Sequence, residues 1–149
     1  MYMINQGYNA YRQTGVKTAS QGQLVVMLYE EACRQLEKAA NYLKPNNTIE
    51  PRFIESLGQS LQKAQDIITE LQVSLDMEKG GEIAQNLMSL YVYFNRELMD
   101  ANIHHNKQKI LFIYDMMCQL RDSWIQAANS TANTTAPTSQ DRPALNITG

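Results

Sequence analysis

The sequence has few charged residues, two cysteines and no long apolar run. Only 19% of its 149 residues are Asp, Glu, Lys or Arg, below the usual quarter for a globular domain. Thirteen basic and fifteen acidic residues leave a net charge of −2, which favours neither nucleic-acid binding nor insertion into a membrane. No apolar stretch reaches the roughly 18 residues of a membrane-spanning helix, and the first residues lack a signal-peptide pattern. A single cytoplasmic domain is therefore expected.

The side chains that carry catalysis or bind metals are also sparse. Cys33 and Cys118 form no C-x-x-C pair, and in a reducing compartment two such residues more commonly serve as buried apolar side chains than as a disulfide. His104 and His105 are adjacent, so they cannot share a metal as residues one helical turn apart would. We expect no catalytic residue, no cofactor and no metal, and hence no enzymatic activity.

Helical periodicity is what the sequence does contain. Apolar residues recur at alternating spacings of three and four, which predicts helices packed nearly parallel to their neighbours. These helices are expected at about 21–43, 51–78, 82–101 and 107–128. The short links between them force an antiparallel order. The expected fold class is all-α: an up-down four-helix bundle with an N-terminal strap or cap over 1–19 and a disordered polar tail over 129–149.

One apolar face of each helix forms the expected core. Its members are Val25, Leu28, Tyr29, Ala32, Leu36, Ala39, Leu43, Ile54, Leu57, Leu61, Ala64, Ile68, Leu71, Leu75, Ile83, Leu87, Leu90, Phe94, Leu98, Ile110, Ile113, Met117, Leu120 and Trp124. The Gly80-Gly81 pair provides positive φ angles to end the second helix, and Asn102 and Asn106 bracket the turn into the last.

The helices carry more apolar residues than this core requires, since a four-helix bundle needs one apolar face per helix. At 100° per residue a second stripe on the last helix lies roughly 120° from the core line. The extra apolar residues are Leu24, Val26, Met27, Met88, Val92, Met99, Leu111, Tyr114, Cys118 and Ile125. Two explanations stand side by side. The strap, with Ile4, Tyr8 and Tyr11, covers them as core, or they form grooves for the amphipathic helices of a partner.

Residues 67–102, IITELQVSLDMEKGGEIAQNLMSLYVYFNRELMDAN, resemble the signature stretch of the FliS family, flagellar export chaperones specific for flagellin. TASQGQLVVMLYEEA at 18–32, GYNAY at 7–11 and Trp124 resemble other parts of that family. The resemblance implies a helical bundle that binds the disordered C-terminal segment of flagellin in hydrophobic grooves. It also implies that the chaperone prevents premature polymerisation and docks at the cytoplasmic gate of the flagellar type III export apparatus.

By position, the resemblance assigns Tyr8 and Tyr11 to a mobile cap, and Tyr91, Tyr93 and Asn95 to a motif of the third helix whose residues serve either the bundle or the partner. The candidate partner-binding residues are Ile4, Tyr8, Tyr11, Leu24, Met27, Met88, Tyr91, Val92, Asn95, Met99, Leu111, Tyr114, Cys118 and Ile125. Two alternatives stay open: a histidine phosphotransfer bundle acting through His104, and a structural bundle that self-associates. Whether a co-chaperone or regulator also binds is left open by the sequence.

Overall fold

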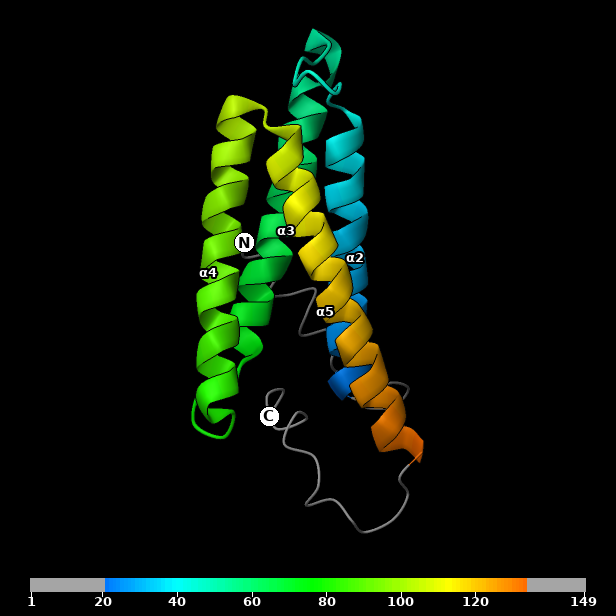
Figure 1. Cartoon of the computed structure of the whole chain (residues 1–149), viewed down its shortest axis with the longest axis vertical. Helices are drawn as coiled ribbons and strands as arrows, with labels where there is room; N and C mark the ends of the chain where they lie inside the picture. The colour runs from blue at the N-terminus through cyan, green and yellow to red at the C-terminus, as the bar shows by residue number, and fades with distance from the viewer. Residues whose placement is uncertain (1–20, 134–149) are drawn as a thin grey trace.

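The computed structural model describes residues 21–133, which form four long helices. These are α2 (Gln21–Asn41), α3 (Ile54–Ser74) preceded by the short 3₁₀ helix η1 (Pro51–Phe53), α4 (Gly81–His104) and α5 (Lys107–Asn133). Consecutive helices run in opposite directions (Figure 1), and residues 21–133 contain no strand, so the all-α bundle is confirmed. The expected strap at 1–19 and tail residues 134–149 lie outside the described residues.

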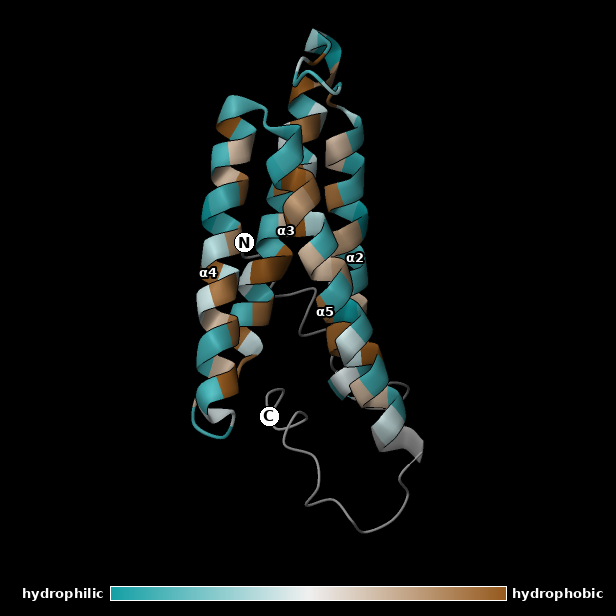
Figure 2. Ribbon diagram, in the orientation of Figure 1, coloured by the Kyte–Doolittle hydropathy of each residue, from teal (hydrophilic) through white to brown (hydrophobic). Residues whose placement is uncertain are grey.

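The four helices do not pack equally tightly. Helix α2 packs most extensively against α5 and α3, whereas α4 packs against α3 and only lightly against α5. Figure 1 shows α4 and α5 close together near the turn that joins them and diverging toward their other ends. Apolar residues recur along all four helices (Figure 2). Since α2 and α4 each contact both α3 and α5, the order around the bundle is α2, α3, α4, α5.

Most of the predicted core is buried, including Leu36, Leu61 and Phe94, which have no exposed surface. Ile54 and Ile83 are exposed, contrary to prediction. Ile54 is the first residue of α3 and Ile83 lies in the first turn of α4, and the end of a helix has fewer neighbours to cover it. Four other predicted core residues are only half-buried: Leu28, Leu75, Leu90 and Leu120.

Helix α3 ends at Ser74, earlier than the predicted 78. The Asp76 carboxylate oxygen Oδ1 accepts hydrogen bonds from the backbone N–H groups of Glu78 (3.1 Å) and Lys79 (2.9 Å). An aspartate that bonds its own following backbone competes with the helical hydrogen bonds. The chain therefore leaves the helix here, and Leu75 is extended.

The two glycines that follow are required for different reasons. Gly81 has φ +57°, the left-handed conformation expected of it. Gly80 has φ −75°, so the prediction of a positive φ at this residue is wrong. Glycine is required at position 80 because a side chain has no room there. A Cβ would lie 2.6 Å from Ala84 Cβ and 2.7 Å from the Asp76 carbonyl oxygen.

Helix α4 continues to His104, beyond the predicted end at 101, so His104 lies in the helix and not in a loop. His105 takes the left-handed conformation (φ 52°) that glycine usually supplies, and the Asn106 N–H donates back to the Ala101 carbonyl at 3.0 Å. Asn106 Oδ1 in turn accepts from the Lys109 N–H (3.1 Å) and so caps the first turn of α5. Without a glycine, the sequence carries no clear stop signal here.

Helix α5 also exceeds its prediction, continuing from 128 to Asn133. Residues 129–133 were assigned to the polar tail, but a formed helix propagates at a cost of only tenths of a kcal/mol for each ordinary polar residue. The start of α5 has a second support from the loop after α2. Asn47, with φ 67°, accepts the Lys107 N–H on its side-chain Oδ1 at 2.9 Å.

Candidate partner-binding surface

Four apolar residues form a line along the outside of α4, which we call the α4 stripe: Met88, Val92, Met99 and Ile103. Met99 is 60% exposed and Ile103 is 67% exposed. Met88 is half-buried, and its Sδ accepts a hydrogen bond from Gln72 Nε2 of α3 at 3.4 Å. The α4 stripe therefore lies on the edge of the bundle where α4 meets α3.

Asn95 lies on the same side of α4, but its polar groups contact α3. Its Nδ2 donates to Thr69 Oγ1 (3.2 Å) and to Gln72 Oε1 (3.3 Å), and its backbone carbonyl oxygen accepts from Gln65 Nε2 (3.1 Å). These bonds hold α4 against α3. Asn95 is a predicted partner-binding residue, but its side-chain NH2 group bonds within the bundle in this structure.

A second line of residues, the α5 stripe, comprises Leu111, Tyr114, Cys118 and Ile125. Leu111 is 38% exposed and the other three are half-buried. Cys118 Sγ lies 3.6 Å from the Sγ of Cys33 on α2. The α5 stripe therefore follows the seam between α5 and α2.

A pocket of about 290 Å³ lies at one end of this seam. It is lined by Gln23, Val26, Met27, Ile125, Ala128 and Asn129. The fold thus brings together Met27 and Ile125, two predicted binding residues far apart in the sequence. The pocket is slightly below the size of typical small-molecule sites and suits one or two large apolar side chains.

The two stripes lie on opposite edges of the bundle. The α4 stripe borders α3 and the α5 stripe borders α2, and in the order α2, α3, α4, α5 these edges face away from each other. The sequence predicted the apolar residues of both stripes but not that the stripes lie on different edges of the bundle. A single partner chain contacts both stripes only if it wraps around the bundle.

Two predicted binding residues are buried in this structure: Leu24 (3% exposed) and Tyr91 (1% exposed). The Tyr91 hydroxyl hydrogen-bonds to the hydroxyl of Tyr29 on α2, and the Trp124 ring packs beside Tyr29 with centroids 6.5 Å apart. Burial raises the pKa of Tyr29 to about 12 and raises that of Tyr91 further. Tyr91 is therefore a core residue here. The predicted cap residues Ile4, Tyr8 and Tyr11 lie outside the described residues.

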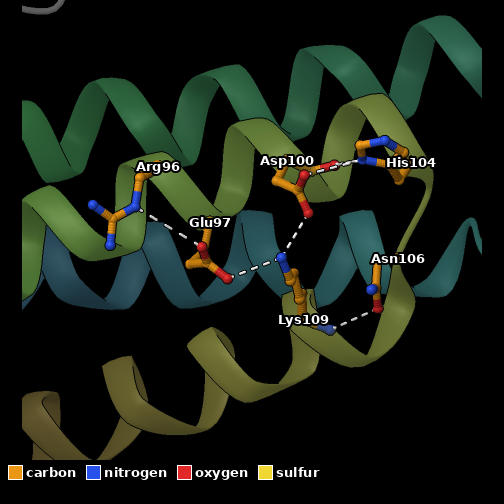
Figure 3. A network of polar contacts seen from close by, with 6 residues as sticks. All are labelled: Arg96, Glu97, Asp100, His104, Asn106 and Lys109. Carbon is orange, nitrogen blue, oxygen red and sulfur yellow. Dashed lines mark hydrogen bonds and ion pairs between the residues drawn. The ribbon is translucent and has the colours of Figure 1, made fainter.

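A polar network joins α4 to α5 near their turn (Figure 3). Lys109 Nζ lies 2.6 Å from Asp100 Oδ2 and 3.0 Å from Glu97 Oε1, and the hydrogen bond from Lys109 lowers the pKa of Asp100. His104 Nδ1 lies 3.0 Å from Asp100 Oδ1. His104 is the last residue of α4 and its ring contacts a carboxylate, so the geometry does not favour phosphotransfer, which requires a histidine supported in mid-helix.

Between residues 21 and 133, no three His, Cys, Asp or Glu side chains are grouped so that they could hold a metal ion. In the same range no helix combines the length and the apolar character needed to cross a bilayer.

Five residues of this surface are not among the predicted binding residues: Ile103 on the α4 stripe, and Gln23, Val26, Ala128 and Asn129 in the pocket. Ile103 continues the spacing of Val92 and Met99, but it lies beyond the predicted end of the helix, so the predicted stripe ends at Met99. Val26 belongs to the extra apolar residues but not to the predicted binding residues, although it lines the pocket. Ala128 gives no signal of its own, because a single alanine next to a polar segment fits any helix end.

An all-helical bundle with exposed apolar residues along two edges is typical of proteins that bind helices of another chain. Residues 3–131 match the sequence model of the family described as flagellar protein FliS. The chain is 36% identical over 124 residues to the flagellar secretion chaperone FliS of Escherichia coli K12, covering 80% of this chain and 87% of that one. It is 32% identical over 127 residues to the FliS of Bacillus subtilis 168, covering 85% and 90%. The chain belongs to the FliS family of flagellar secretion chaperones.

Proposed function

We propose that this chaperone binds the disordered C-terminal segment of flagellin in the cytoplasm, prevents its premature polymerisation and delivers it to the flagellar type III export gate. Family membership supports the class of partner. The observation that carries the mode of binding is the pair of apolar stripes on opposite edges of the bundle, with Met99 60% exposed on one and Leu111 38% exposed on the other.

The mechanism is coupled folding and binding. A flexible segment becomes helical on the bundle as its apolar side chains cover the α4 stripe, the α5 stripe and the pocket. Burial of roughly 1,000–3,000 Å² offsets an ordering cost of about 2–5 kcal/mol or more. Methionine suits such a surface because its flexible side chain adapts to different apolar shapes. No step of this mechanism calls for a nucleotide or a metal.

The first test is co-purification with full-length flagellin and with flagellin that lacks its C-terminal segment. We expect a complex with the full-length protein alone. Equal binding to both would refute the proposed binding segment. Sedimentation of the chaperone alone at several concentrations separates this function from self-association, which predicts oligomers that form without flagellin.

The second test places a charge on the α5 stripe. We expect Leu111→Asp and Tyr114→Asp each to weaken flagellin binding by roughly tenfold or more, because a buried carboxylate costs well above the 1.4 kcal/mol that this factor represents. Gln119→Asp, on the exposed polar face of the same helix, is the matched control and should bind normally. Binding is measured by calorimetry, with helicity checked by circular dichroism. Normal binding by both folded variants would exclude the α5 stripe from the groove.

A further inference from the structure

Cys33 and Cys118 are 85 positions apart, yet their Sγ atoms lie 3.6 Å from each other across the seam between α2 and α5. An S–S bond of about 2.05 Å needs an approach of only about 1.5 Å from this contact. We propose that the pair is a redox-modifiable site, which forms a reversible intramolecular disulfide between α2 and α5 when the protein meets a peroxide. This inference does not depend on the proposed function.

The surroundings of the two thiols assign them different roles. Cys118 is half-buried on the α5 stripe, and the Arg121 guanidinium, one turn further along α5, interacts electrostatically with both thiols. Cys33 is 3% exposed, and burial raises its pKa to about 12. A peroxide therefore reaches Cys118 first, and the buried Cys33 thiol reacts only with the oxidised sulfur of Cys118.

The chemistry balances in two steps. The Cys118 thiolate attacks one oxygen of hydrogen peroxide, the O–O bond breaks, and a sulfenic acid forms while hydroxide takes up the proton released by the thiol. The Cys33 sulfur then attacks the Cys118 sulfur, the S–S bond forms, and the sulfenic hydroxyl leaves with the Cys33 proton as water. Two thiols lose two electrons, and the peroxide is reduced to two waters.

The bond would link the two helices that pack most extensively, and it would close a loop of 85 positions. A crosslink over so long a loop restricts the unfolded chain and raises stability. It would also remove a thiol from the middle of the α5 stripe. A thiol reductant should reverse both effects.

The test treats the full chain with one equivalent of hydrogen peroxide. We expect both free thiols to disappear, the mass to fall by two hydrogen atoms, the chain to stay monomeric on a non-reducing gel, and the unfolding midpoint to rise by several degrees. Dithiothreitol should restore the starting values. Retention of both thiols under conditions that oxidise a free cysteine peptide, or formation of intermolecular dimers alone, would overturn the proposal.

Two variants test the order of the steps. Cys118→Ser changes a half-buried side chain and should keep its Cys33 thiol under the same peroxide treatment. Cys33→Ala should accumulate a sulfenic acid at Cys118 that dimedone labels. Circular dichroism confirms that each variant is folded. Oxidation of Cys33 in Cys118→Ser as fast as in the wild type would overturn the assignment of Cys118 as the attacking thiol.

Discussion

The Tyr29 and Tyr91 hydroxyls form the main polar contact inside the core. They come from α2 and α4, which face each other across the bundle, and both side chains are buried. A buried hydroxyl without a partner is costly, so each hydroxyl makes the burial of the other tolerable. The Trp124 ring packs beside Tyr29, with centroids 6.5 Å apart, which extends the cluster to α5. This single cluster therefore connects three helices.

Because the Tyr29 and Tyr91 hydroxyls are buried, we expect the free energy of unfolding to fall at alkaline pH. Each pKa is raised in the folded state above its ordinary value of 10, so the folded protein holds these protons more tightly than the unfolded chain. The contribution of the two tyrosines to the free energy of unfolding is fully present below pH 10, and it is lost as the pH rises through about 12. Urea unfolding at about pH 8 and about pH 11 should show a fall in the free energy of unfolding.

The double variant Tyr29→Phe/Tyr91→Phe lacks both buried hydroxyls. Its free energy of unfolding should therefore fall less between about pH 8 and about pH 11 than that of the wild type. Tyr93→Phe, outside the pair, is the matched control and should behave like the wild type. Tyr91→Phe alone should lower the free energy of unfolding by about 1 kcal/mol at neutral pH. An identical pH dependence in the wild type and the double variant would contradict this account.

At the level of elements, the ends of the helices depend on side chains from neighbouring segments. The loop after α2 is tied to α5 by the Asn47 side chain, and by Lys107 Nζ, which donates to the Leu43 carbonyl at 2.8 Å. Helix α4, which packs lightly on α5, is held to it by Lys109 through Glu97 and Asp100. These polar contacts fix the helices where apolar packing alone is thin.

Asn47 accepts a hydrogen bond from the Lys107 N–H and also adopts a left-handed backbone conformation, and three substitutions separate these two contributions. Asn47→Gly removes the hydrogen bond to the Lys107 N–H but accepts φ 67°, and should cost about 1 kcal/mol of unfolding free energy. Asn47→Ala also strains the backbone and should cost about 2 kcal/mol. Asn47→Asp keeps the acceptor and should stay near the wild type. Urea denaturation measures all three. Equal losses for Gly and Ala would show that the backbone conformation contributes nothing.

At the scale of the whole molecule, the separation of the stripes sets how a partner must bind. The α4 stripe and the α5 stripe lie on opposite edges, so one compact helix cannot cover both. An extended segment that folds on the surface in two pieces can do so. This geometry suits a disordered partner better than a folded one.

We expect two distant charges to act independently if one segment occupies both stripes. Met99→Asp and Leu111→Asp should each weaken flagellin binding by roughly tenfold, and together by roughly a hundredfold, since effects at separated sites add. Ser89→Asp, exposed on α4, is the matched control. Calorimetry gives the affinities, and hydrogen exchange should show each single variant releasing a different part of the bound segment. A binding defect from one stripe alone would indicate a single groove.

The sequence by itself determined the bundle and most of its core. Periodicity is a local property, because residues three and four apart share a face of a helix wherever that helix lies. That is why Leu36, Leu61 and Phe94 were predicted to be buried and are. The extra apolar stripes were visible in the sequence for the same reason. Tyr91, four residues after Leu87 and three before Phe94, also has the spacing of a core residue, and only the family resemblance placed it among the binding residues.

Only the tertiary structure decided which distant side chains meet. The Cys33 and Cys118 thiols, the Tyr29 and Tyr91 hydroxyls, and the separation of the two stripes all depend on how the helices are rotated against one another. That rotation follows from the packing of the whole core, to which every helix contributes at once. A local pattern carries no record of it, so the placement of the two stripes on opposite edges became apparent only when the helices were placed together.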